Sequence, residues 1–127
     1  MRLFALPISD VETGRSPRYP DLQPLHVSAS PERTFSAVSA VAGRHRKWTV
    51  VKVDTVGRVL AVEARSRVWG FLDDVTVRVE AEAKGSSVHV RSRSRSGGLD
   101  RGAGARLIRA FLKKVDDELK SQNGSAR

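Results

Sequence analysis

The sequence predicts an α+β fold: an antiparallel sheet of four to five strands, element order β-α-β-β-β-β-α, with one face covered by helices. Three observations support this prediction. Four consecutive segments in the middle of the chain are rich in valine and alternate apolar with polar residues, as half-buried strands do. Segments before and after them repeat apolar residues at helical spacing. The strand segments are joined by short connections, which favour antiparallel pairing.

The composition is that of one globular domain. The chain has 127 residues, 39% hydrophobic and 29% charged, and a compact chain of this length buries roughly two-thirds of its unfolded surface. We expect a proline-containing arm over residues 1–22, a single α+β domain over 23–121 and a flexible tail over 122–127. The absence of cysteine excludes disulfides, thiolate metal sites and a cysteine nucleophile.

The first elements of the domain follow from alternation and a capping signal. Residues 24–29 are predicted as a strand, because Leu25 and Val27 alternate with polar residues. A helix then begins with Ser30 as N-cap and Pro31 in the first turn, and Gly43 is expected to end it. Its apolar face consists of Phe35, Val38 and Val41.

Four strands are predicted next, over residues 47–54, 58–66, 71–83 and 87–96. Lys84 to Ser87 are expected to form the hairpin connection between the last two, with a glycine at a turn position. In the third strand the expected core face is Val75, Val77, Val79 and Ala81, and the opposite face is Thr76, Arg78, Glu80 and Glu82.

The tract RSRSRS, from Arg91 to Ser96, allows two interpretations. Alone, it resembles a disordered, RNA-associated segment. In phase with Val88 and Val90, it is an ordered strand whose serines face inward and whose arginines face outward. The strand interpretation is favoured, because the tract is short and follows a β-branched run.

A second helix is predicted from about Asp100, a candidate cap, to Lys120. Gly102 and Gly104 in its first turn lower its intrinsic stability, and close approach of the backbone to the sheet is one compensation. The apolar stripe consists of Ile108, Phe111, Leu112, Val115 and Leu119.

Two motifs carry a resemblance to a known family. The segment WGFLDDVTVRV contains Phe-x-Asp-Asp-Val, and VHVRSRSRSGGLDRGAGARLIRAFL contains Val-Arg-Ser-x-Ser-Arg-x-Gly-x-x-Asp-x-Gly followed by Arg-x-Ile. With RYPDLQPL, they make the chain similar to domain of unknown function 1499, found in bacteria and plastids, from about Tyr19 to Leu119. The chain departs from the family pattern at Ser96, Leu99 and Gly104. The resemblance implies no established reaction, substrate or cofactor.

The charged residues of these motifs predict either a polar pocket or a structural cluster where the last strand meets the last helix. Arginines bind carboxylates or phosphates bidentately, and an aspartate can act as a general base. The alternative, which we favour, is that these groups pair with and cap one another. The candidate anion- or ligand-binding residues are Asp73, Asp74, Arg91, Ser92, Ser94, Arg95, Asp100 and Arg106. The candidate lining of an apolar pocket is Trp69, Phe71 and Phe111, while Trp48 is expected in the core or at its rim.

The formal charge of +9 favours attraction to nucleic acid or anionic lipid. The outward sheet face is expected to carry Arg78, His89, Arg91 and Arg93, with Lys52 and Arg65 as further candidates. No aromatic residue alternates with these arginines to stack bases, so an ordinary solvated face is favoured over a nucleic-acid surface. The three histidines fall in different elements, and no metal site or cofactor is expected.

These observations favour a non-catalytic module that binds a small ligand, such as a small anion, or a protein partner. The alternative is a basic adaptor for nucleic acid or an anionic membrane surface, and an enzyme using Asp73 or Asp74 is the least favoured. Because Pro7 interrupts the first apolar run and no stretch reaches the ~18 apolar residues of a membrane span, we expect a cytoplasmic protein, with a membrane-peripheral location as the alternative.

Overall fold

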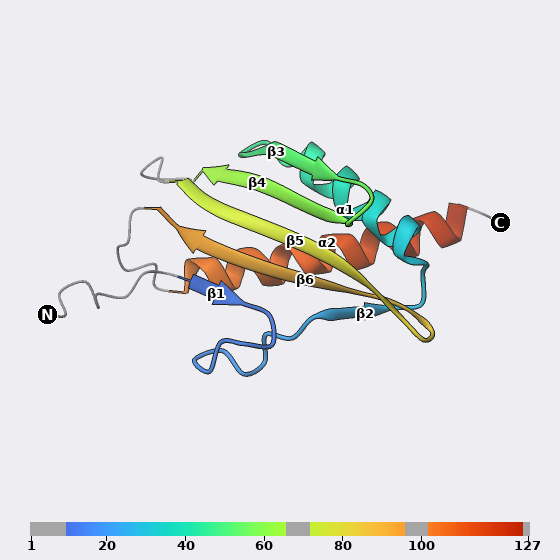
Figure 1. The fold of residues 1–127 in the computed structure, drawn as a ribbon, viewed down its shortest axis with the longest axis horizontal. Coiled ribbons are helices and arrows are strands. Elements are labelled where there is room, and N and C mark those ends of the chain that lie inside the picture. The colour runs from blue at the N-terminus through green and yellow to red at the C-terminus, as the bar shows by residue number, and fades with distance from the viewer. Residues whose placement is uncertain (1–9, 66–71, 96–101, 126–127) are drawn as a thin grey trace, which may run out of the picture.

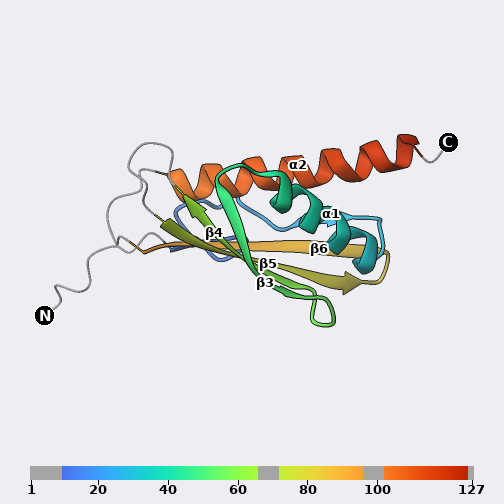
Figure 2. The same ribbon diagram turned by 90° about the horizontal axis from the view of Figure 1, so that it is seen from above.

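A six-stranded antiparallel sheet with two helices forms the fold of the chain. The computed structural model describes residues 10–65, 72–95 and 102–125. Both helices pack on the same face of the sheet, as the two views in Figures 1 and 2 show. The α+β class and the one-sided helical cover are therefore confirmed. The elements are β1 (Asp10–Glu12), β2 (Leu25–Val27), α1 (Pro31–Arg44), β3 (Trp48–Asp54), β4 (Val59–Arg65), β5 (Leu72–Glu82), β6 (Gly85–Ser94) and α2 (Ala103–Ser125).

The strand order across the sheet is β1-β6-β5-β4-β3, and β2 also pairs with β6. The long β5–β6 hairpin forms the centre, and β4 and β3 extend it on one side. On the other side the two short strands share one edge: β2 pairs with the start of β6 and β1 with its end. The sheet therefore follows chain order except for β1 and β2, which return to the last strand.

The arm supplies β1, a strand that the sequence analysis did not predict. Val11 and Leu22 of the arm are buried in the core. The backbone N–H of Thr13 donates to the Val90 carbonyl at 3.0 Å, and the Val90 N–H donates to the Thr13 hydroxyl at 3.1 Å. Strands are predicted from alternating polar and apolar residues, and a three-residue strand with one inward apolar side chain is too short to show this alternation. Its pairing with β6 could therefore not be predicted from the sequence.

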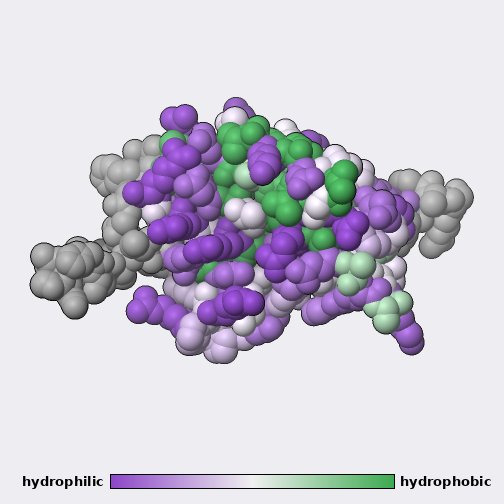
Figure 3. Space-filling view, in the orientation of Figure 1, coloured by the Kyte–Doolittle hydropathy of each residue, from purple (hydrophilic) through white to green (hydrophobic). Residues whose placement is uncertain are grey.

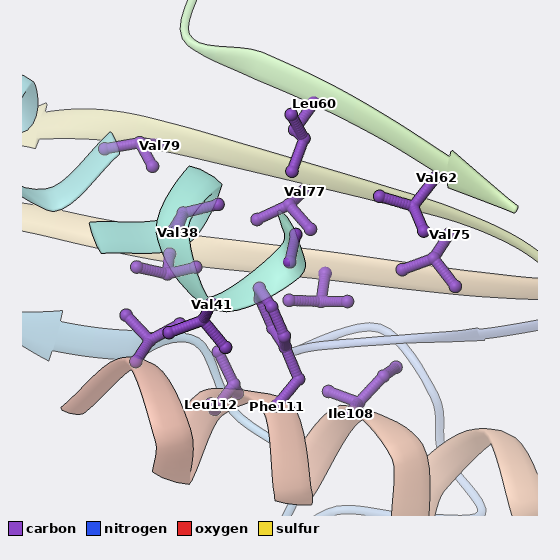
Figure 4. Close-up of a cluster of buried hydrophobic side chains, with 14 of the residues drawn as sticks. Val38, Val41, Leu60, Val62, Val75, Val77, Val79, Ile108, Phe111 and Leu112 are labelled. Carbon is purple, nitrogen blue, oxygen red and sulfur yellow. The ribbon is translucent and has the colours of Figure 1, made fainter. Parts of the chain in front are cut away.

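The core lies between the sheet and the two helices, and the predicted apolar faces form it. Figure 4 shows Ile108, Phe111 and Leu112 of α2 pointing towards the valines of β4 and β5. All five residues predicted for the stripe of α2 are buried. Ala81, which was expected on the core face of β5, is exposed, because it lies near the hairpin end of the strand.

The ends of α1 show which capping signals were decisive. The Ser30 hydroxyl accepts the Arg33 backbone N–H at 3.2 Å, and Pro31 begins the helix, as predicted. Gly43 does not end α1: the helix continues to Arg44, and His45 leaves it in an extended conformation. A glycine ends a helix efficiently where it takes a positive φ, and Gly43 does not.

Helix α2 begins later and ends later than the sequence suggested. It starts at Ala103, directly after Gly102, whose φ of +82° only glycine adopts readily. It runs past Lys120 to Ser125. Asp100, the predicted cap, lies outside the described residues. No helix in the described part of the chain is long and apolar enough to cross a membrane.

The RSRSRS tract is a strand as far as the described residues reach. Ser92 is buried, whereas Arg91, Arg93 and Arg95 are exposed on the opposite face. The predicted hairpin connection was too long at its C-terminal end, because Gly85 and the two serines after it already belong to β6. Ser86 is held inside: its hydroxyl donates to the Ala29 carbonyl at 2.9 Å and lies 2.7 Å from Oγ1 of Thr34. These hydrogen bonds, to residues more than fifty positions away in the chain, satisfy the buried hydroxyl and override the turn preference of serine.

Candidate functional site

The predicted motif residues do not form one cluster, because the sheet separates them onto two faces. Asp73 pairs in register with Ser94 on the helix side, and Asp74 pairs with Arg93 on the open side. Ser92 is also on the helix side, buried in the core. Because neighbouring residues of a strand point to opposite faces, the side chains of Asp73 and Asp74 lie on opposite sides of the sheet.

Arg95 organises the motif on the open face. Its guanidinium donates to both carboxylate oxygens of Asp74, with Nε 3.0 Å from Oδ2 and Nη2 2.8 Å from Oδ1. Its Nη2 also donates to Glu63 on β4 at 2.7 Å. The hydrogen bonds from Arg95 hold the pKa of Asp74 below its ordinary value. Arg95 therefore links three neighbouring strands through the carboxylates of Asp74 and Glu63. The charges of the guanidinium and of the two carboxylates compensate one another within this cluster.

Other basic side chains of the open face are compensated in the same way. Arg91 forms a bidentate pair with Asp10 of β1, and Arg78 donates to Glu80 at 2.8 Å. Glu80 also lies 3.4 Å from His89. Figure 3, which views this face, shows hydrophilic side chains over β5 and β6 and a hydrophobic area over β3 and β4. The face expected to be basic is thus balanced in charge at Arg78, Arg91 and Arg95, whereas Arg93 and Lys52 are exposed and form no ion pair among the described residues.

A cleft of about 440 Å³ opens on the helix side, where the start of β3, the end of β4 and the start of β5 meet the first half of α2. It combines an apolar floor with charged side chains at its rim. Three predicted site residues reach it: Asp73, Arg106 and Phe111. The lining residues are His45, Lys47, Trp48, Ala64, Arg65, Asp73, Ala103, Arg106, Leu107, Ala110, Phe111 and Lys114.

Aromatic side chains build the floor of this cleft. The rings of Trp48 and Phe111 stack with centroids 5.0 Å apart, and both side chains are almost fully buried. Leu107 and Ala110, one turn apart on α2, line the wall beside them. Trp48 is therefore a core aromatic, as expected, and the small part of it that stays exposed borders the cleft.

His45 closes one end of the floor by stacking on Trp48, with centroids 4.7 Å apart. Burial, and after it the charge of Lys114, lower the pKa of His45 below its ordinary value. Its Nδ1 accepts the backbone N–H of Lys47 at 3.2 Å. A neutral imidazole whose Nδ1 accepts a hydrogen bond carries its proton on Nε2, so His45 offers one neutral donor.

Positive charge at the rim of the cleft is not compensated like that of the open face. Lys47, Arg65 and Lys114 line the cleft and form no ion pair within the described part of the chain. Asp73 is the one carboxylate among the described lining residues. The rim therefore carries more positive than negative charge around a largely apolar floor.

The sequence analysis missed much of this site. His45, Lys47 and Trp48 come from the connection after α1, and Lys114 from the middle of α2. The run His45-Arg46-Lys47-Trp48, in which basic residues flank an aromatic, was the one local signal for it. Trp69 and Phe71, predicted to line an apolar pocket, lie outside the described residues. Nowhere in the described ranges do three or more His, Asp or Glu side chains gather to hold a metal ion.

Comparison with known proteins identifies a family. A family model described as "Protein of unknown function (DUF1499)" matches residues 7–115. No curated protein matches the chain. Among solved structures, the chain is similar to protein CV1439 from Chromobacterium violaceum, with 14% sequence identity, a TM-score of 0.42 and coverage of 84% of this chain and 94% of that one.

Proposed function

The chain belongs to the DUF1499 family, and from that premise we propose that it is a non-catalytic module that binds a small organic ligand in the cleft between the sheet and α2. The observation that supports this is the cleft itself: about 440 Å³, with a stacked aromatic floor and polar groups at its rim. Small-molecule sites in proteins have this size and this division between apolar walls and a few polar groups.

The chemistry of the lining favours binding over catalysis. Among the described lining residues there is no serine, threonine or tyrosine hydroxyl to act as a nucleophile. Nδ1 of His45 already accepts the Lys47 backbone N–H, and Nε2 carries the proton of the neutral ring. Neither ring nitrogen is therefore free to accept a proton from a ligand. Of the two aspartates considered as a general base, Asp74 lies on the opposite face of the sheet and is bound by Arg95. Asp73 lines the cleft and is the carboxylate that a catalytic function would have to use.

The Asp/Arg motif is assigned a structural role in this proposal. Arg95 with Asp74 and Glu63 joins β6, β5 and β4, and Arg91 with Asp10 joins β6 and β1. These pairs are surface-exposed, so each contributes modestly to stability. Together they hold the strand ends that carry Asp73 and Ala64 into the cleft wall.

A basic adaptor for nucleic acid or anionic membrane is the second candidate, because the formal charge is +9. Such binding weakens steeply with added salt, whereas an apolar ligand in the cleft does not. Binding to DNA, RNA and anionic vesicles that falls with salt and is unaffected by blocking the cleft would favour this second function.

The test uses Trp48 as the reporter. The Trp69→Phe variant leaves Trp48 as the single tryptophan of the chain, so its indole resonance and fluorescence report on the cleft. We expect fragments from a small-molecule library to shift the indole N–H of Trp48 in NMR spectra. Ala110→Phe fills the wall of the cleft and should abolish these shifts.

Ala83→Phe is the matched control, since Ala83 is an exposed alanine in the β5–β6 connection, outside the cleft lining. It should leave fragment binding unchanged. The proposal is wrong if no fragment shifts the Trp48 indole, or if the shifts survive Ala110→Phe at full size.

A further inference from the structure

We infer that the ligand of this cleft is an amphipathic carboxylate: an apolar chain or ring that carries one carboxylate group. The inference rests on the proposed binding function and adds to it the class of ligand. The juxtaposition that supports it is an apolar, aromatic floor beside two rim lysines, Lys47 and Lys114, for which the described residues supply no ion-pair partner.

The first step is the contrast between the two faces of the sheet. On the open face, Arg78, Arg91 and Arg95 each donate to a carboxylate at 2.6–2.9 Å. On the cleft side, the cations include Lys47 and Lys114, for which the described residues supply no ion-pair partner. Within the described part of the chain, Arg93 and Lys52 of the open face are also without an ion-pair partner, but Lys47 and Lys114 differ from them in lining this cleft, where a bound anion would compensate their charge.

Neighbouring acids on α2 are not available to compensate the rim. Asp117 lies 3.0 Å from Lys113, and Glu118 lies 2.6 Å from Arg44 on α1. Lys114 directly follows Lys113 in the sequence, and its charge contributes to lowering the pKa of the His45 ring. The positive potential of Lys114 therefore acts inside the cleft.

The second step concerns the head group. Arginine and lysine side chains are donors only, and His45 in its neutral form presents Nε2–H as a further donor. A carboxylate is acceptor-only, so it can take hydrogen bonds from all of these groups at once. An ammonium group would meet four cationic lining residues and, among the described residues, the single carboxylate of Asp73. A hydroxyl would satisfy fewer donors.

The third step concerns the body of the ligand. Trp48 and Phe111 form the floor, and Leu107 and Ala110 form the wall. Burial of alkyl or aryl surface against them is favourable in proportion to the apolar area removed from water. An inorganic anion would leave this surface unused, which is why an organic acid fits better than a free phosphate.

The experiment compares three probes that share one alkyl chain: octanoate, octanol and octylamine. Each is titrated into the Trp69→Phe protein while the Trp48 indole and the His45 ring are observed by NMR. We expect octanoate to bind about tenfold more tightly than octanol, because a hydrogen bond to a charged group contributes about that factor. Octylamine should produce no shift at either residue.

Charge variants identify the groups responsible. The double variant Lys47→Gln with Lys114→Gln should weaken octanoate binding about tenfold and leave octanol binding unchanged. The double variant Lys52→Gln with Lys84→Gln is the matched control, since both lysines are exposed, form no ion pair among the described residues and do not line the cleft.

The outcomes separate the two proposals. Equal binding of octanoate and octanol overturns the carboxylate inference and leaves the binding function standing. Binding of library fragments at Trp48 without binding of octanoate does the same. If neither the probes nor any fragment shifts Trp48, both proposals are wrong.

Discussion

Arg91 donates through Nε and Nη2 to the two carboxylate oxygens of Asp10, at 2.9 and 2.6 Å. The two residues are eighty-one positions apart in the chain and belong to β6 and β1. This bidentate contact fastens the N-terminal strand to the edge of the sheet, beside the backbone pairing of Val11 with Ser92.

Asp10→Asn is expected to reduce the free energy of unfolding by no more than about 1 kcal/mol at neutral pH, because both partners are partly exposed. The hydrogen bond from Arg91 lowers the pKa of Asp10 in the folded state. The ionised Asp10 carboxylate therefore contributes its full share to the free energy of unfolding above the unfolded-state pKa of about 3.9. This contribution is lost as the pH falls through the lower pKa of the folded state. Urea unfolding of both proteins should show curves that converge in acid. A difference of the same size at about pH 2 would contradict this account.

Gly85→Ala is expected to destabilise the chain by several kcal/mol, more than an ordinary surface substitution. Gly85 has a φ of +143°, which other residues rarely adopt, and an added Cβ would overlap the Val27 carbonyl oxygen. Strain and overlap act together at the point where β2 meets β6. Gly43→Ala is the control, because a Cβ there meets nothing within 4 Å, and it should be neutral or slightly stabilising. Thermal unfolding distinguishes the two, and equal midpoints would refute the prediction.

Ser86→Ala is expected to cost about 1–3 kcal/mol, because the buried Ala29 carbonyl loses its closer donor and keeps only the Thr34 hydroxyl at 3.5 Å. Thr34→Val removes the other hydroxyl of this cluster at nearly constant volume. The double variant should lose less than the sum of the single losses, since no hydroxyl is then left without its partner. Strict additivity in urea unfolding would show that the two hydroxyls act independently.

His45 is expected to titrate below its ordinary pKa of about 6.5 and to carry its proton on Nε2 when neutral. Burial is the larger cause, so Lys114→Gln should raise the pKa of His45 only part of the way. Because the folded pKa is the lower one, the stability contributed by neutral His45 is complete above about 6.5 and falls as the pH drops through the folded value. Nitrogen-15 NMR of the ring measures both properties. A proton on Nδ1 at neutral pH would contradict the Lys47 hydrogen bond.

Local patterns in the sequence determined the secondary structure and its faces. Alternation in residues 87–94 fixed that Ser92 points inward and Arg91 outward, because the side-chain period of a strand admits no other arrangement. Ser30 and Pro31 fixed the start of α1 in the same way, since the cap bonds only to residues three positions along the chain. The family resemblance also came from the sequence, and the family model confirms it.

The tertiary structure decided which of these faces came together. Asp73 and Asp74 are neighbours in the motif, yet one lines the cleft and the other binds Arg95 on the opposite side of the sheet. The cleft is built from the connection after α1, the start of β3, the end of β4, the start of β5 and the first half of α2, and no local pattern relates these segments. A strand or helix pattern predicts which side chains share a face. It does not predict which other face they pack against, because that depends on contacts between residues far apart in the chain. The stacking of Trp48 on Phe111 is such a contact, and only the folded structure reveals it.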